Sequence, residues 1–115
     1  MSATEHYLNQ GYTPKNKTIV IQESAAVAVW TPLTSTRVVV TELGLSTNLA
    51  TTVAFYWGSA GDKIAEFLLP GSAAIVPSIG IWEGTAYDRG LYARASIGST
   101  DGVRVNLTGF EIPQW

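Results

Sequence analysis

The sequence contains no cysteine and only one histidine, His6, among its 115 residues. The absence of cysteine excludes disulfides, thiolate metal sites and a cysteine nucleophile together. A lone histidine in a polar N-terminal segment lacks the positioned partner that a general base requires, so a Ser-His-Asp triad is not expected. The nine acidic residues are spread along the chain without the spacing of a calcium loop. The sequence therefore predicts no enzyme activity, no metal site and no cofactor.

Charge is also scarce: charged residues make up 14% of the chain, against roughly 25% in a typical soluble domain. The seven basic residues are scattered and the net charge is −2, so no nucleic-acid partner is expected. No apolar run approaches the ~20 residues that span a bilayer. The first ten residues, MSATEHYLNQ, lack the pattern of a signal peptide. We expect a soluble protein that has no membrane partner and is not secreted by the usual route.

Large, weakly charged β surfaces usually end up covered, most often by identical subunits. We therefore expect the protein to associate with copies of itself.

What the sequence does contain is period-two alternation of apolar and polar residues, the pattern of half-buried strands. It is clearest in residues 91–97 (LYARASI) and 103–112 (VRVNLTGFEI). The five residues between these runs, GSTDG, suit a turn. The pattern predicts a closing β-hairpin from Leu91 to Ile112, with the rest of the chain forming more sheet against its apolar face.

Seven further short strands are expected before this hairpin, with turns every 8–12 residues and no helix. They are residues 17–22, 25–31, 37–43, 49–57, 64–69, 72–76 and 79–83. At this length the chain forms one domain. We expect an N-terminal arm over residues 1–16 and an all-β, single-domain β-sandwich over residues 17–115. An eight-stranded jelly roll fits best, and an immunoglobulin-like sandwich is the main alternative.

Two details of the pattern leave alternatives open. Three consecutive valines, Val38 to Val40, indicate a strand buried on both faces or a subunit contact on the second face. In the last strand, Phe110 and Ile112 fall on the opposite parity from Val103 to Leu107. A bulge at Gly109 would restore one apolar face. Otherwise the strand passes from one environment to another, for example from the core to a subunit interface.

The candidate interaction residues are mostly aromatic, because tyrosine and tryptophan anchor protein contacts and stack on sugar rings. Trp30 and Trp57 lie within strands and are expected in the core. Glu83 and Asp88, beside Trp82 and Tyr87, could pair as in a glycosidase, although a solvated loop is the better explanation of these acids. The candidates are Tyr7 and Tyr12 in the arm, the loop residues Trp82, Tyr87, Asp88 and Arg89, and Trp115, which is expected to pack on its own domain or on a neighbouring copy.

The chain as a whole resembles the small β-sandwich virion proteins of tailed bacteriophages, especially capsid decoration proteins and tail-associated modules. The likeness covers residues 17–112, in stretches such as AAVAVWTPLTSTRVVVTELGLS, LATTVAFYWG and LYARASIGSTDGVRVNLTGFEI. The resemblance implies a virion protein without enzyme activity that forms a trimer, or another symmetric assembly, on a larger particle.

Two functions are therefore weighed. The first is this structural role on a capsid or tail. The alternative is a carbohydrate- or receptor-binding module that uses the loop around Trp82.

Overall fold

The described part of the chain contains nine strands that pair in antiparallel fashion. The structure is a computed structural model, and it describes residues 7–59, 61–77, 79–84, 86–96 and 102–113. The strands are β1 (Lys15–Ile21), β2 (Val27–Trp30), β3 (Thr36–Thr47), β4 (Thr51–Trp57), β5 (Lys63–Leu69), β6 (Ala73–Ile75), β7 (Trp82–Glu83), β8 (Leu91–Ala95) and β9 (Val103–Pro113). Each of the predicted strands overlaps one of these.

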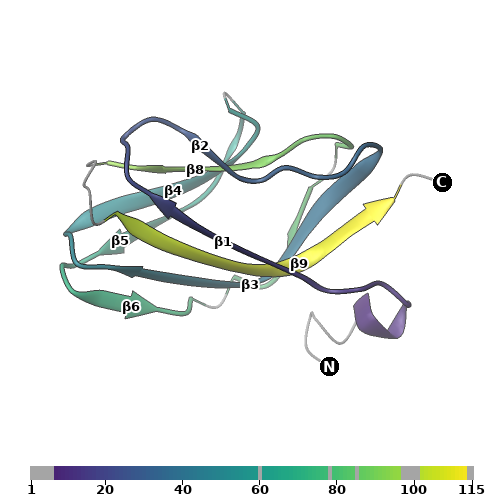
Figure 1. Cartoon of the computed structure of the whole chain (residues 1–115), viewed down its shortest axis with the longest axis horizontal. Helices are drawn as coiled ribbons and strands as arrows, with labels where there is room; N and C mark the ends of the chain where they lie inside the picture. Colours follow the sequence, from purple (N-terminus) through teal and green to yellow (C-terminus); the bar gives the residue numbers. More distant parts are fainter. Residues whose placement is uncertain (1–6, 60, 78, 85, 97–101, 114–115) are drawn as a thin grey trace.

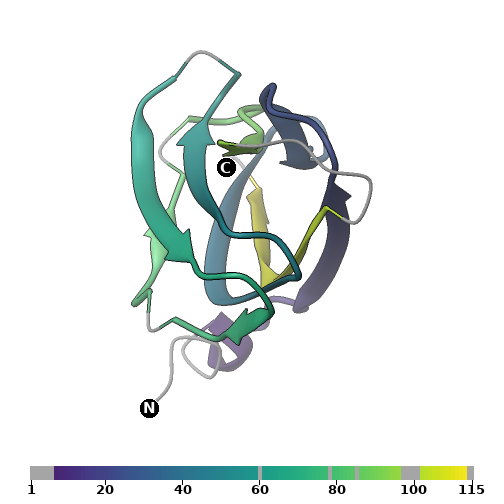
Figure 2. The same ribbon diagram turned by 90° about the vertical axis from the view of Figure 1, so that its left-hand side faces the viewer.

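The strands form two sheets that face each other across one core (Figures 1 and 2). The first, called here the β1 sheet, has the order β1-β9-β3-β6, with β7 also paired to β3. The second, the β2 sheet, has the order β2-β8-β4-β5. Among the described residues, no helix is long and apolar enough to cross a membrane.

The pairing of the strands is nested. β4 pairs with β5, β3 with β6 and β7, β2 with β8, and β1 with β9. The chain thus folds back on itself at the turn after β4, and successive pairs lie alternately in the two sheets. This arrangement is a jelly roll, which confirms the predicted fold class over the immunoglobulin-like alternative. β6 and β7 act as two pieces of one strand, because both pair with β3 along the same edge.

The predicted closing hairpin is wrong. β8 lies in the β2 sheet between β2 and β4, whereas β9 lies in the β1 sheet between β1 and β3. The connecting residues 97–101 lie outside the described residues. Alternation shows that each strand has one apolar face, but two strands that face each other across a core give the same pattern as two neighbours in a sheet. Ala93 and Val105 both face the common core, from opposite sheets.

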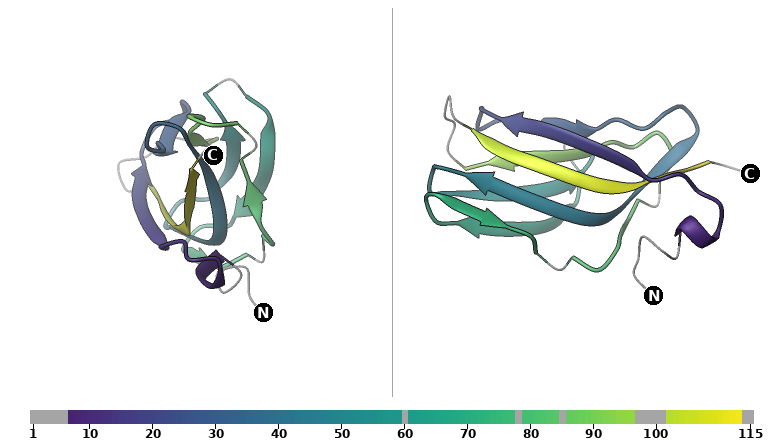
Figure 3. Two further views of the ribbon diagram at one scale, coloured as in Figure 1. Left: turned by 90° about the vertical axis from the view of Figure 1, so that its right-hand side faces the viewer. Right: turned by 60° about the horizontal axis from the view of Figure 1, so that its bottom comes forward.

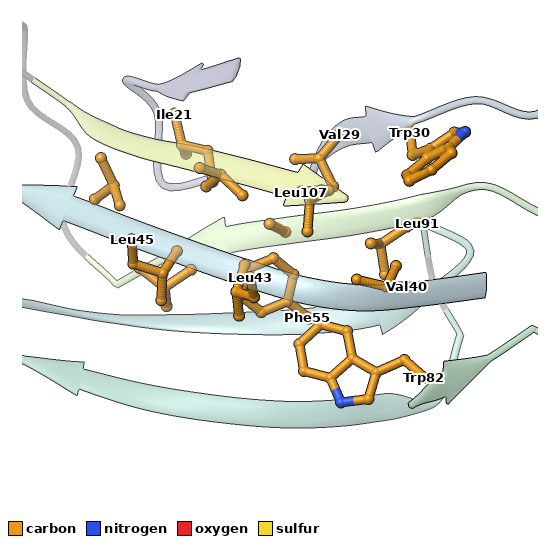
Figure 4. Close-up of a cluster of buried hydrophobic side chains, with 14 of the residues drawn as sticks. Ile21, Val29, Trp30, Val40, Leu43, Leu45, Phe55, Trp82, Leu91 and Leu107 are labelled. Carbon is orange, nitrogen blue, oxygen red and sulfur yellow. The ribbon is translucent and has the colours of Figure 1, made fainter. Parts of the chain in front are cut away.

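A bulge in β3 decides which of its residues face that core. Val38 and Val40 belong to the core cluster, and so do Leu43 and Leu45, which have the opposite parity. The register against β9 shifts between Val40 and Glu42. The additional residue reverses which side chains of the second half of the strand face inward. The twelve-residue strand therefore keeps an apolar face toward the core along its length. Figure 4 shows Val40, Leu43 and Leu45 pointing into the same layer as Phe55.

β9, in contrast, continues through Gly109 without a bulge of its own. Gly109 pairs with Val40, and Phe110 pairs with Val39. Phe110 and Ile112 therefore face away from the main core, and they form a second cluster with Val39. The predicted bulge at Gly109 is therefore wrong, because the bulge lies in the partner strand β3. As the alternative predicted, β9 passes from one environment to another, here from the main core to the second cluster. The three valines of β3 are buried on both faces of the sheet.

Candidate interaction surfaces

The N-terminal arm covers the second apolar cluster, at one end of the outer face of the β1 sheet. Residues 7–9 form a single helical turn, which lies beside the end of β9 in Figure 3. Tyr7 is 6% exposed and joins Val39, Phe110 and Ile112, with Tyr12 packed against them. The ring centroids of Tyr7 and Phe110 are 5.1 Å apart, and those of Tyr7 and Tyr12 are 6.3 Å apart. Both predicted arm aromatics thus pack on the domain of their own chain.

A hydrogen bond also attaches the arm to the sheet. The Tyr7 hydroxyl donates to Oε1 of Glu83 on β7, at 3.0 Å. Burial of the ring and this bond raise the pKa of Tyr7 above its ordinary value. Next to it, Arg37 donates to the carbonyl oxygen of Gly84 at 3.2 Å. The short strand β7 is therefore held to the arm on one side and to β3 on the other.

Truncating Tyr7 should release the arm. We expect Tyr7→Ala to lower the free energy of unfolding by about 3 kcal/mol, because it removes a buried ring. Tyr7→Phe keeps the ring but removes the hydroxyl that bonds to Glu83, and it should cost about 1 kcal/mol. Urea unfolding measures both, and amide exchange at residues 8–12 should rise in the alanine variant alone. Equal exchange in the two variants would contradict the assignment of the ring as the main anchor.

Trp82 is a core residue, which corrects the prediction of a tryptophan surface for sugar stacking. It is 8% exposed, and its ring lies between the sheets beside Phe55 (Figure 4). The ring centroids of Trp82 and Phe55 are 5.2 Å apart, and Trp82 stacks on Phe67 at 6.3 Å. As predicted, Trp30 is also in the core, at 1% exposure, and Trp57 packs against it. The sequence misplaced Trp82 because β7 is too short for its alternation to be recognised.

The rest of the predicted loop is tied to the fold. Oδ1 of Asp88 accepts a bond from the backbone N–H of Ser35 at 2.6 Å, and the N–H of Asp88 donates to the carbonyl of Thr36 at 2.8 Å. Both Ser35 and Asp88 have positive φ, 62° and 64°. These bonds hold two strained turns together.

Glu83 and Asp88 therefore have separate partners, the hydroxyl of Tyr7 and the N–H of Ser35. Tyr87 is half-buried and Arg89 is exposed. Trp115 lies outside the described residues.

A buried carboxylate, which the sequence analysis did not single out, joins three segments at one end of the sandwich. The Glu111 side chain is 4% exposed. It accepts bonds from Nζ of Lys15 at 2.5 Å, Nε1 of Trp30 at 3.0 Å and the N–H of Leu33 at 3.3 Å. Burial on its own would raise the pKa of Glu111, but the Lys15 and Trp30 bonds and the Lys15 charge together hold it below its ordinary value. In the sequence, this buried carboxylate is marked by a single acidic residue at an inward-facing position of β9.

The outer faces of both sheets are shallowly hollowed. A hollow of about 630 Å³ and one of about 400 Å³ lie on the β1 sheet, and one of about 380 Å³ lies on the β2 sheet. Arg104 borders the second of these and Arg94 the third. The described residues contain no group of three or more His, Cys, Asp or Glu side chains that could hold a metal ion.

Comparisons with known proteins add little to this geometry. No protein-family model and no curated protein sequence matches the chain. Among solved structures, the chain is similar to the cryo-EM structure of the virus-like particle of extra small virus from the giant freshwater prawn Macrobrachium rosenbergii. The identity is 12% and the TM-score 0.41, over 91% of this chain and 82% of that chain. A similarity of this size supports no conclusion about function, and the jelly-roll assignment rests on the strand pairing itself.

Proposed function

We propose that this protein is a non-enzymatic structural protein of a virus particle, which forms a symmetric homo-oligomer on a larger particle. A capsid decoration protein of a tailed bacteriophage that assembles as a trimer is the specific form we favour. Jelly rolls are the domains from which many viral capsids are built. They also serve as lectins and cupins, so the fold alone does not decide between these roles.

The observation that carries the proposal is the outer face of the β1 sheet. Strand register places short side chains side by side across β1, β9 and β3. Away from the end where the arm packs, this face carries one acid and one base on these three strands, Glu42 and Arg104, and Val20 and Val76 on or beside it are 38% and 83% exposed. The outward residues of this part of the face are Asn16, Thr18, Val20, Glu42, Gly44, Ser46, Arg104, Asn106 and Thr108.

Covering this face with another subunit is made cheaper by two pairs of its polar side chains, which already bond to one another. The Thr18 hydroxyl donates to Oδ1 of Asn106 at 2.9 Å, and the Thr108 hydroxyl donates to Oδ1 of Asn16 at 2.8 Å. A polar group that is hydrogen-bonded before burial avoids most of the penalty for losing water. A face of short side chains, several of them already paired, therefore suits an interface between copies.

Light scattering after size exclusion tests the proposal. We expect the full-length protein to form a stable trimer, and Thr18→Lys to dissociate it because the interface would then bury an unpaired charge. The matched control is Leu68→Lys, at a 78% exposed position on the outer face of the other sheet, which should leave the mass unchanged. A protein that stays monomeric at high concentration would contradict the proposal. Dissociation of the trimer by the control variant alone would show that the interface lies on the β2 sheet instead.

A further inference from the structure

The hollow on the outer face of the β2 sheet lies over a small residue, Ala54. Val53 and Phe55 belong to the core cluster, so Ala54 between them faces outward. It is nevertheless only 7% exposed. Strand register places Arg94 on one side of it and Glu66 on the other. The longer side chains around Ala54 form the walls of a hollow of about 380 Å³, whose lining residues are Thr52, Ala54, Tyr56, Lys63, Glu66, Arg94 and Ser96.

One wall presents an oriented guanidinium group. Nε of Arg94 donates to the carbonyl oxygen of Ser24 at 2.8 Å, which fixes the side chain against the loop between β1 and β2. A guanidinium group has five N–H donors in a planar fork, and this bond uses one of them. Such a fork matches the geometry of a carboxylate.

The opposite wall carries an ion pair between Lys63 and Glu66. The hollow therefore has two cations and one anion, a net charge of one positive unit. Tyr56, which lies opposite Tyr92 on the same outer face, adds a half-buried ring beside these charges. At Ser96 and Thr52, the Ser96 hydroxyl accepts the backbone N–H of Thr52 at 3.0 Å, which closes the end of the hollow.

We propose that this hollow binds a sugar that bears a carboxylate group, such as a uronic acid. The carboxylate pairs with Arg94, the sugar ring lies against Tyr56 over Ala54, and Glu66 accepts bonds from sugar hydroxyls. The combination of an aromatic ring, a guanidinium fork and hydrogen-bonding side chains around a small floor suits this ligand class. The site is independent of the assembly proposed above, since it lies on the other sheet.

The two hollows on the β1 sheet are weaker candidates. In the larger one, Asn16, Thr18, Asn106 and Thr108 already bond to each other in pairs. A ligand there would have to compete with these bonds. The hollow over Ala54 combines an oriented cation with an aromatic ring, which the larger hollow lacks among its lining residues.

Amide chemical shifts of the full-length, ¹⁵N-labelled protein during titration with glucuronic acid test the proposal. We expect saturable shifts centred on Ala54 and Arg94, with a dissociation constant on the order of 1 mM, as befits a shallow site for a small ligand. Glucose and acetate are the matched probes, because each carries one half of the recognised chemistry. Both should bind at least about tenfold more weakly.

Two variants locate the site. Ala54→Leu fills the hollow from a position that points away from the core, and Arg94→Lys keeps the charge but loses the fork. Each should weaken glucuronic acid binding about tenfold. Ala74→Leu, on the outer face of the other sheet, is the control and should leave glucuronic acid binding unchanged. The proposal is overturned if glucuronic acid gives no saturable shifts, if glucose or acetate binds equally well, or if Ala54→Leu binds as the native protein does.

Discussion

Replacing Gly109 by alanine is expected to lower the free energy of unfolding by about 3 kcal/mol. A Cβ at this position would lie 2.1 Å from the carbonyl oxygen of Val39 and 3.1 Å from two ring carbons of Trp30. The first contact is with the backbone of the neighbouring strand, so no side-chain rotation can relieve it. The second is with a ring that is 1% exposed and has no room to move.

Urea unfolding measures this loss, and Gly44→Ala is the matched control. Gly44 lies in the middle of β3, and a Cβ there would meet its nearest neighbour, Cβ of Asn106, at 3.8 Å, an ordinary contact. We expect that variant to stay within about 0.5 kcal/mol of the native protein. Equal stability of the two variants would mean that β9 does not approach Val39 and Trp30 as closely as the structure has it.

Replacing Glu111 by glutamine should remove about 2 kcal/mol of stability at neutral pH, because it weakens charge-assisted bonds to Lys15, Trp30 and Leu33 in a buried position. Folding lowers the pKa of Glu111, so the folded state favours the ionised form. This contribution is fully present above the unfolded value of about 4.3. It is lost as the pH falls through the lower, folded value.

The measurement is the difference in unfolding free energy between the native protein and Glu111→Gln, taken from neutral to strongly acidic pH. We expect the difference to shrink below about pH 4.3. Glu23→Gln, at an exposed position between β1 and β2, should cost less than about 0.5 kcal/mol at any pH. A difference for Glu111→Gln that is independent of pH would show that the carboxylate contributes by its shape alone.

The candidate surfaces were only partly visible in the sequence. The aromatic arm was recognisable because Tyr7 and Tyr12 stand in an otherwise polar segment. The apolar patch that receives the arm was visible as the opposite parity of Phe110 and Ile112 and as Val39, the middle one of the three valines of β3. Trp82 was misjudged. The hollow over Ala54 was missed because its walls combine β4 and β5 with β8, which is distant from them in sequence.

The sequence by itself determined the strands, the polar turns and the β-sandwich class, because these depend on local alternation and on the conformations that Gly, Pro, Asn and Asp allow. Tertiary structure alone decided which strands pair. β8 and β9 carry the same apolar pattern whether they are neighbours or face each other, and only the nested closure of the whole chain assigns them to different sheets. Tertiary structure also decided that Trp82 and Glu111 are buried, since burial depends on segments that meet only after the two sheets pack.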